Sequence, residues 1–280
     1  MKVAVIGGGT MGNGIAHVLA QYGHEVTLVE AEQARVDKAL ATIKGNLDRQ
    51  AKKEIITAAQ AEAALKRING ATSIDDCRGV ELAVEAVFED FAVKQDIFKR
   101  LDAVCPKGAL LASNTSAISI TKIAAVTKRP AQVIGMHFMN PVPLMKLVEV
   151  VTGQATAPET LQRVMQLARD LGKTPVAVQD YPGFISNRVL LPMINEAVFC
   201  LMEGIADRDA IDTVMKLGMN HPMGPLTLAD FIGLDVCLDI MEVLHEGLGD
   251  DKYRPCPLLR RMVAAGHLGR KSGRGFYEYA

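Results

Sequence analysis

A glycine-rich turn near the start of the chain could bind a dinucleotide. Residues 7–12 read Gly-Gly-Gly-Thr-Met-Gly and follow an apolar run. In this pattern Gly7 permits a tight turn, Gly9 lets a pyrophosphate approach the backbone, and Gly12 allows close packing of a helix on a strand. Glu30 ends the next apolar run and could accept hydrogen bonds from ribose hydroxyls. We therefore expect cofactor contacts from Gly7, Gly9, Thr10, Met11, Gly12 and Glu30.

The carboxylate of Glu30 also bears on the type of cofactor. It would repel a 2′-phosphate, so the sequence predicts NAD rather than NADP. NADP stays an alternative, because the guanidinium of the nearby Arg35 could approach such a phosphate.

Hydride transfer from an alcohol to a nicotinamide needs a group that takes the alcohol proton. Histidine suits this task, since its reference pKa of about 6.5 lies near neutrality. His137 ends an apolar run, on the side where open parallel sheets bind ligands, and is the candidate general base. His221, in a predicted loop, is the alternative candidate for the general base. Surface or packing roles are more common for the others, which lie in or beside helical patterns: His17, His24, His245 and His267.

The elements that must position these residues alternate along the first part of the chain. Apolar runs predict strands over residues 2–7, 25–30, 82–87, 109–113, 133–138, 144–151 and 174–178, with helical patterns between them. Such alternation predicts a parallel sheet with helices on both faces. Residues 31–69 carry two long charged helical patterns and predict an inserted helical hairpin.

Beyond a turn signal at residues 180–183 the strand-like runs stop. Helices are predicted over residues 184–203, 207–217 and 226–248, the last long enough to be buried at an interface. Gly204, Gly218 and Gly249 stand where helix C-caps are expected. We predict a Rossmann-type doubly wound sheet domain over residues 1–182 and a mostly α-helical domain over residues 183–280.

Composition limits the partners. The 280 residues carry a formal net charge of −1, which gives no global sign of nucleic-acid or membrane binding. The five cysteines form no C-x-x-C pair, so neither a disulfide framework nor a metal site is expected. The absence of a signal-peptide pattern favours a cytoplasmic location. An anionic ligand needs local positive charge, which Arg49, Lys52 and Lys53 could supply, although they also fit a solvated helix face.

Several longer motifs resemble one family. Residues 135–150, Gly-Met-His-Phe-Met-Asn-Pro-Val-Pro-Leu-Met-Lys-Leu-Val-Glu-Val, resemble the signature of the 3-hydroxyacyl-CoA dehydrogenases. Further motifs of that family are resembled, in the same order, by residues 113–116, 182–188, 222–225 and 269–277. The resemblance covers essentially the whole chain and is strongest to free-standing bacterial members that act on 3-hydroxybutyryl-CoA. It implies NAD-dependent interconversion of an (S)-3-hydroxyacyl-CoA, such as 3-hydroxybutyryl-CoA, with a 3-oxoacyl-CoA, such as acetoacetyl-CoA.

The resemblance also implies roles for single residues. His137 would be the general acid and base, and Glu149 would orient it. On pattern alone, Glu149 is more simply a surface acid at a strand edge. The turn that residues 140–143 predict could let the next strand return Glu149 towards His137, where a carboxylate fixes the imidazole tautomer. Ser116 and Asn187 would hydrogen-bond the reacting 3-oxygen of the substrate.

Further contacts follow from the same resemblance. NAD would be contacted by Glu89, Lys94, Ser116, Asn140 and Lys271. On pattern alone, Lys94 and Lys271 are as easily solvated lysines. Coenzyme A would be bound by Lys53 and by Asn46, which stands where related enzymes often carry a serine. The resemblance further implies a homodimer formed through the C-terminal helices.

Two other function classes fit part of the sequence. Dehydrogenases of free 3-hydroxyacids also join a nucleotide-binding domain to helices. In that class the catalytic residue is a lysine in a long helix, and the long helix predicted here, residues 184–203, contains no lysine. The family resemblance extends to a structural eye-lens crystallin that retains cofactor binding, and the intact set of Ser116, His137, Glu149 and Asn187 favours catalysis instead.

Overall fold

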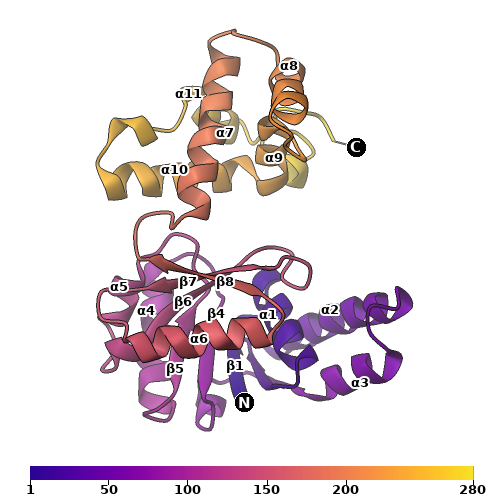
Figure 1. Ribbon diagram of the computed structural model, residues 1–280, viewed down its shortest axis with the longest axis vertical. Coiled ribbons are helices and arrows are strands. Elements are labelled where there is room, and N and C mark those ends of the chain that lie inside the picture. Colours follow the sequence, from indigo (N-terminus) through magenta and orange to yellow (C-terminus); the bar gives the residue numbers. More distant parts are fainter. Residues whose placement is uncertain (280) are drawn as a thin grey trace. The chain divides into compact units, whose positions relative to one another are not determined.

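The computed structural model describes residues 1–279 and divides the chain into two compact units (Figure 1). The first unit is Met1–Asp180 and the second is Tyr181–Ala280. Among the described residues, no helix combines the length and the apolarity that crossing a membrane requires.

The first unit is built on an eight-stranded sheet with the strand order β3-β2-β1-β4-β5-β6-β7-β8. The strands are β1 (Lys2–Ile6), β2 (Glu25–Val29), β3 (Ile68–Ala71), β4 (Leu82–Glu85), β5 (Leu110–Ser113), β6 (Val133–Phe138), β7 (Leu147–Thr152) and β8 (Thr174–Gln179). All neighbouring pairs are parallel except β6 and β7, which are antiparallel. The strand order reverses direction between β1 and β4, where open α/β sheets bind their ligands.

The central strands are apolar because both of their faces are covered. Every residue of β4, β5 and β6 is buried. Parallel strands in such a setting are near-continuous apolar runs. The polar exceptions stand at or near the carboxyl ends of these strands: Glu85, Ser113 and His137.

Helices cover the sheet on both faces. A shared core joins one face to α1 (Thr10–Gln21), α2 (Gln33–Lys52), α3 (Ala58–Lys66) and α6 (Pro158–Asp170). The other face is covered by α4 (Phe91–Val104) and α5 (Ile120–Ala124). The doubly wound architecture predicted from the sequence is therefore confirmed.

The segment between β2 and β3 forms two helices, α2 and α3 (Figure 1). A capping box fixes the start of α3: Thr57 Oγ1 accepts from the Gln60 N–H, and Gln60 Oε1 accepts from the Thr57 N–H. The edge strand β3 was not predicted, because Asn69 and Gly70 weaken its strand signal.

The second unit is helical, with α7 (Ser186–Met202), α8 (Arg208–Thr213), α9 (Pro225–Ile232), α10 (Leu234–Leu248) and α11 (Pro257–Ala264). A π-helical turn, Val214–Gly218, continues α8. The prediction of one helix over residues 226–248 is wrong. Gly233 has a φ of +108°, outside the helical region, and separates α9 from α10. The buried Asp230 accepts hydrogen bonds from the N–H groups of Phe276 and Tyr277, which ties the final segment to α9.

Candidate active site

Three glycines shape the turn between β1 and α1, each for a different reason. Gly7 has a φ of +98°, which L side chains rarely adopt. A Cβ on Gly12 would lie 1.8 Å from the Gly7 carbonyl oxygen, so only glycine fits there. The space beside Gly9 is open, with no atom within 4 Å of an added Cβ. The turn therefore leaves room for a phosphate beside the first N–H groups of α1.

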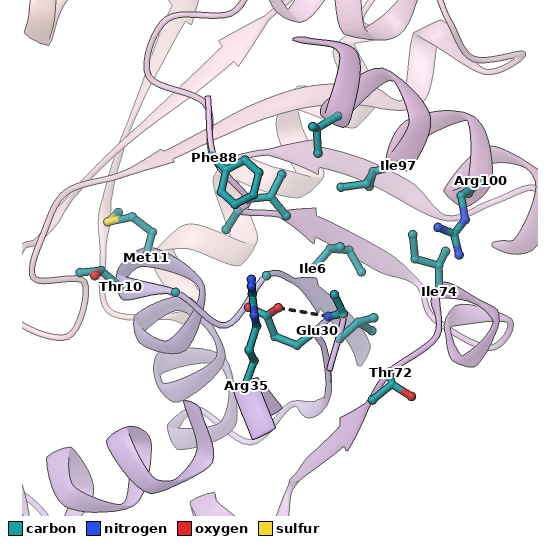
Figure 2. A pocket seen from close by; sticks show the side chains of 17 residues that line it. Ile6, Thr10, Met11, Glu30, Arg35, Thr72, Ile74, Phe88, Ile97 and Arg100 are labelled. Carbon is teal, nitrogen blue, oxygen red and sulfur yellow. Dashed lines mark hydrogen bonds between the residues drawn. The ribbon is translucent and has the colours of Figure 1, made fainter. Parts of the chain in front are cut away.

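A cavity of about 510 Å³ opens from this turn, at the carboxyl ends of β1, β2 and β4 (Figure 2). Five of the predicted cofactor contacts line it: Gly7, Gly9, Thr10, Met11 and Glu30. Apolar side chains, among them Ile74 and Ile97, form the wall away from Thr10 and Met11. A cavity with a phosphate-binding end and an apolar end fits a dinucleotide.

The Glu30 carboxylate is held against the glycine turn. Its Oε1 accepts from the Gly8 N–H at 2.7 Å and its Oε2 accepts from the Ala31 N–H at 3.1 Å. The negative charge therefore has a fixed place in the cavity wall, where Arg35 also lies. Each oxygen keeps a further lone pair, with which Glu30 could accept from a ribose hydroxyl.

His137 and Glu149 are brought together by the antiparallel pairing of β6 and β7. They are direct partners in the strand register. His137 Nδ1 lies 2.7 Å from Glu149 Oε2, and both side chains are buried. Because the carboxylate accepts the Nδ1–H, the second ring nitrogen, Nε2, is the one that can accept a proton.

Ser116 lies on the other side of the imidazole. Its Oγ is 3.1 Å from His137 Nε2. The loop that carries Ser116 follows β5 and is joined to the end of β6, since Asn114 Oδ1 accepts from the Phe138 N–H at 2.9 Å. A continuous series of polar contacts thus runs from Glu149 through His137 to Ser116.

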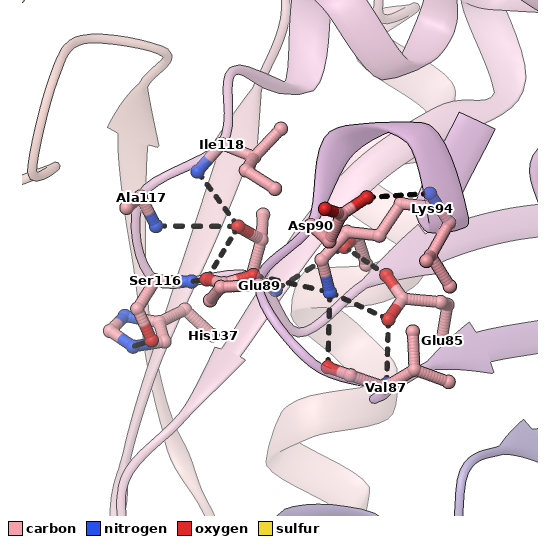
Figure 3. A network of polar contacts seen from close by, with 12 residues as sticks. Glu85, Val87, Glu89, Asp90, Lys94, Ser116, Ala117, Ile118 and His137 are labelled. Atoms are coloured by element: carbon pink, nitrogen blue, oxygen red, sulfur yellow. Dashed lines mark hydrogen bonds and ion pairs between the residues drawn. The ribbon is translucent and has the colours of Figure 1, made fainter. Parts of the chain in front are cut away.

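Glu89 and Lys94 lie beside this series (Figure 3). The Ser116 N–H donates to Glu89 Oε1, and Lys94 Nζ lies 3.2 Å from Glu89 Oε2. Lys94 is only 1% exposed, so the alternative of a solvated lysine is wrong for this residue. Its second carboxylate partner, Glu85 at 2.7 Å, was missed in the sequence, because a glutamate in an apolar run carries no signal of its partner.

A second cavity of about 350 Å³ lies between α2 and the turn after β6. It is lined by His17, Asn46, Arg49, Gln50, Lys53, Ile55, Pro141, Pro143 and Leu144. Asn46 and Lys53 therefore share one hollow, and Arg49 Nη2 donates to Asn46 Oδ1. Lys52 is exposed and does not line this cavity.

The remaining site candidates are distributed over the turn after β6 and the second unit. Asn140 is exposed in that turn. In the second unit, Asn187 lies in the first turn of α7, and its N–H donates to the Gly183 carbonyl. Lys271 Nζ lies 2.5 Å from Asp235 Oδ2. His221 lies in the loop before α9, where its N–H donates to the Met215 carbonyl.

Both units of the chain match domains of one known protein family. Residues 2–181 match the 3-hydroxyacyl-CoA dehydrogenase NAD binding domain, and residues 183–279 match the C-terminal domain of the same family. The chain belongs to the 3-hydroxyacyl-CoA dehydrogenase family. The resemblance seen in the sequence is thereby confirmed, together with the predictions of an NAD-dependent dehydrogenase and of NAD as cofactor.

Several 3-hydroxyacyl-CoA dehydrogenases are similar to this chain over its whole length. The probable 3-hydroxybutyryl-CoA dehydrogenase of Bacillus subtilis is 56% identical, over 99% of this chain and 97% of that protein. The mitochondrial hydroxyacyl-coenzyme A dehydrogenase of Homo sapiens is 42% identical, over 99% of this chain and 90% of that protein. The crystal structure of (S)-3-hydroxybutyryl-CoA dehydrogenase from Ralstonia eutropha has a TM-score of 0.98 and 51% identity, covering 100% of this chain and 99% of that one.

Proposed function

We propose that this chain oxidises the 3-hydroxyl of (S)-3-hydroxybutyryl-CoA with NAD and, in the reverse direction, reduces acetoacetyl-CoA with NADH. The contact series Glu149–His137–Ser116 carries the proposal. Transfer of a proton from an alcohol needs an imidazole held in one orientation, and Glu149 holds His137 in this way while Ser116 lies at the reactive nitrogen. The choice of acyl group is supported by the similar proteins from Bacillus subtilis and Ralstonia eutropha, which are named as a probable 3-hydroxybutyryl-CoA dehydrogenase and as (S)-3-hydroxybutyryl-CoA dehydrogenase.

In the oxidation, His137 Nε2 accepts the proton of the substrate hydroxyl. The Glu149 carboxylate stabilises the imidazolium that forms and keeps the ring in one orientation. For this, the Ser116 hydroxyl turns its one hydrogen from Nε2 to the reacting oxygen, where it donates a hydrogen bond as negative charge develops. We assign the same task to Asn187. In the reduction, His137 returns the proton.

The cofactor site is assigned to the turn and the cavity of the first unit. Gly7, Gly9, Thr10, Met11 and Gly12 would hold the pyrophosphate, and Glu30 the adenosine ribose. Bound NAD supplies the hydride acceptor for C3 of the substrate. We also retain Glu89, Lys94, Ser116, Asn140 and Lys271 as cofactor contacts. Because Lys94 is buried beneath Glu89, its share would be exerted mainly through that carboxylate.

The second cavity would receive the coenzyme A part of the substrate. Lys53 and Arg49 give it positive charge, and Asn46 gives it an amide beside them. A thioester substrate with phosphates suits this cavity better than a free hydroxyacid does, since the free acid would leave these cations without a partner. Homodimerisation through the C-terminal helices and a cytoplasmic location stay predictions from the sequence.

A spectrophotometric assay tests this proposal. NADH oxidation would be followed with acetoacetyl-CoA, beside NADPH with the same thioester and NADH with free acetoacetate. We expect turnover with NADH and the thioester alone. Turnover of free acetoacetate would instead favour the free-acid class. Bound NADH without turnover of the thioester would favour the crystallin-like, non-catalytic class.

A further inference from the structure

Glu85, at the carboxyl end of β4, is a buried carboxylate that contacts Lys94 of α4 and Ser113 of β5. Its side chain is completely buried. Oε1 accepts from Lys94 Nζ at 2.7 Å and from the Val87 N–H at 2.7 Å. Oε2 accepts from Ser113 Oγ at 2.6 Å. A whole buried ion pair can often be replaced by apolar groups without loss of stability, so stability alone does not explain why this pair is present.

Lys94 distributes its three donors over three acceptors. Nζ donates to Glu85 Oε1, lies 3.3 Å from the Val87 carbonyl oxygen and 3.2 Å from Glu89 Oε2 (Figure 3). An ammonium has three N–H groups, and these three contacts account for them. One buried cation thus holds two carboxylates, and the position of Glu89 depends on how Lys94 is shared with Glu85.

Glu89 also holds the loop that carries Ser116, because it accepts hydrogen bonds from that loop. Its Oε1 accepts from the Ser116 N–H and, at 2.8 Å, from Thr115 Oγ1. A second, shorter route leads to the same loop, because Ser113 Oγ accepts from the Thr115 N–H at 3.2 Å. Both routes begin at Glu85. The first ends at Thr115 and Ser116 and the second at Thr115, next in the chain to Ser116, whose Oγ lies 3.1 Å from His137 Nε2.

We propose that Glu85 is a positioning residue for the reaction: acting through Lys94, Glu89 and Ser113, it sets the place of the Ser116 hydroxyl beside His137. This inference rests on the proposed function. A neutral side chain at position 85 would leave the Lys94 charge to Glu89 alone. Glu89 would then be drawn towards Lys94 and away from the Ser116 N–H. A displacement of about 1 Å at a reacting group can cost roughly 10²-fold in rate.

The test is a double-mutant cycle of Glu85→Gln and Ser116→Ala, measured as kcat for acetoacetyl-CoA reduction at saturating NADH. With Ser116 present, we expect Glu85→Gln to lower kcat by about tenfold or more. In the Ser116→Ala background, we expect the same change to lower it by less than about twofold, because two residues that act as a unit are not additive. Equal factors in both backgrounds, or no effect with Ser116 present, would overturn the proposal.

A matched control lies at the other end of the same strand. Glu81 precedes β4 at the surface, where its Oε1 accepts from the Lys2 N–H at 3.0 Å. Glu81→Gln removes the same charge and is expected to leave kcat within about twofold of the unchanged chain. If Glu85→Gln does not fold, Glu85→Asp takes its place, since it keeps the charge and withdraws the carboxylate by one methylene group.

A readout without substrate separates this inference from the proposed function. The ¹⁵N and ¹H signals of the His137 ring report the contact with Ser116 Oγ. We expect them to shift in Glu85→Gln and to stay in place in Glu81→Gln, whichever substrate the chain uses. Unmoved ring signals in Glu85→Gln would overturn the inference. A chain that is inactive on acetoacetyl-CoA but shows this shift would contradict only the proposed function.

Discussion

His137 and Glu149 are direct partners across β6 and β7, and their side chains meet at 2.7 Å between Nδ1 and Oε2. The antiparallel register makes this contact local to two strands, although the residues are separated by a turn. Both strands lie within the sheet, and both side chains are buried. The pair is thus held on two paired strands, which suits a group that must be oriented before it reacts.

Glu149→Gln tests the charge of this pair. The amide oxygen can still accept the Nδ1–H, but the variant cannot stabilise an imidazolium by charge. We expect kcat to fall by roughly 10²-fold or more, with a much smaller change in the KM for acetoacetyl-CoA. Steady-state kinetics check this. Glu159→Gln, at an exposed position of α6, is the control and should leave kcat unchanged. A Glu149→Gln variant with near-normal kcat would contradict the assigned role.

Gly12→Ala tests the close packing under the glycine-rich turn. Its Cβ would lie 1.8 Å from the Gly7 carbonyl oxygen, so the turn or α1 must shift. We expect NADH affinity to fall at least tenfold and the melting temperature to drop. Fluorescence titration and thermal unfolding measure the two effects. Gly45→Ala is the matched control, because Gly45 lies within α2 with open space around it. That change should leave NADH binding intact and raise stability by about 0.5–1 kcal/mol.

How much of this could be predicted follows from which residues carry a local signal. The contact of Glu149 with His137 was implied by the family resemblance, and the turn at residues 140–143 only agreed with it. The central strands are apolar runs, which predict strands directly. The edge strand β3 gave no such signal. Gly70 stands in β3 because a Cβ there would lie 2.2 Å from Val36 Cγ1 of α2. A requirement set by a packing partner is invisible in the strand itself.

Tertiary contacts and backbone conformation also explain two other points at which the structure differs from the prediction. Lys94 has the pattern of a solvated lysine, and only the fold brings it between Glu85 and Glu89. The separation of α9 from α10 depends on the positive φ of Gly233, whereas a glycine within a helical pattern is ordinarily tolerated at a cost of about 1 kcal/mol.

Lys53→Ala tests the assignment of the second cavity. If Lys53 contacts a phosphate of coenzyme A, the KM for acetoacetyl-CoA should rise by about tenfold, and kcat should change little. The KM for acetoacetyl-pantetheine, which lacks the phosphates, should stay the same. Lys52→Ala is the control, since Lys52 is the exposed neighbour outside this cavity. An equal rise in KM for both thioesters would contradict the phosphate contact.

His17, which lines this cavity, makes the stability of the folded chain depend on pH. Burial lowers the pKa of the His17 imidazole below its ordinary value of 6.5, and Lys173 lowers it further. Below pH 6.5 the unfolded chain therefore binds a proton that the folded chain excludes, so the free energy of unfolding falls as the pH drops towards the folded-state pKa. His17→Gln should reduce the loss of melting temperature between pH 7.5 and pH 5.5. An unchanged loss would contradict this effect.

The role of His137 is tested most directly by the single-turnover rate constant of His137→Gln, with NADH binding measured on the same sample. We expect this rate constant for acetoacetyl-CoA reduction to fall by roughly 10²- to 10⁴-fold, the usual effect of losing a general acid and base. NADH affinity should stay within about threefold of the unchanged chain, because His137 is outside the cavity that is assigned to NAD. Near-normal turnover by His137→Gln would contradict the role of His137 as general acid and base and would favour His221 instead.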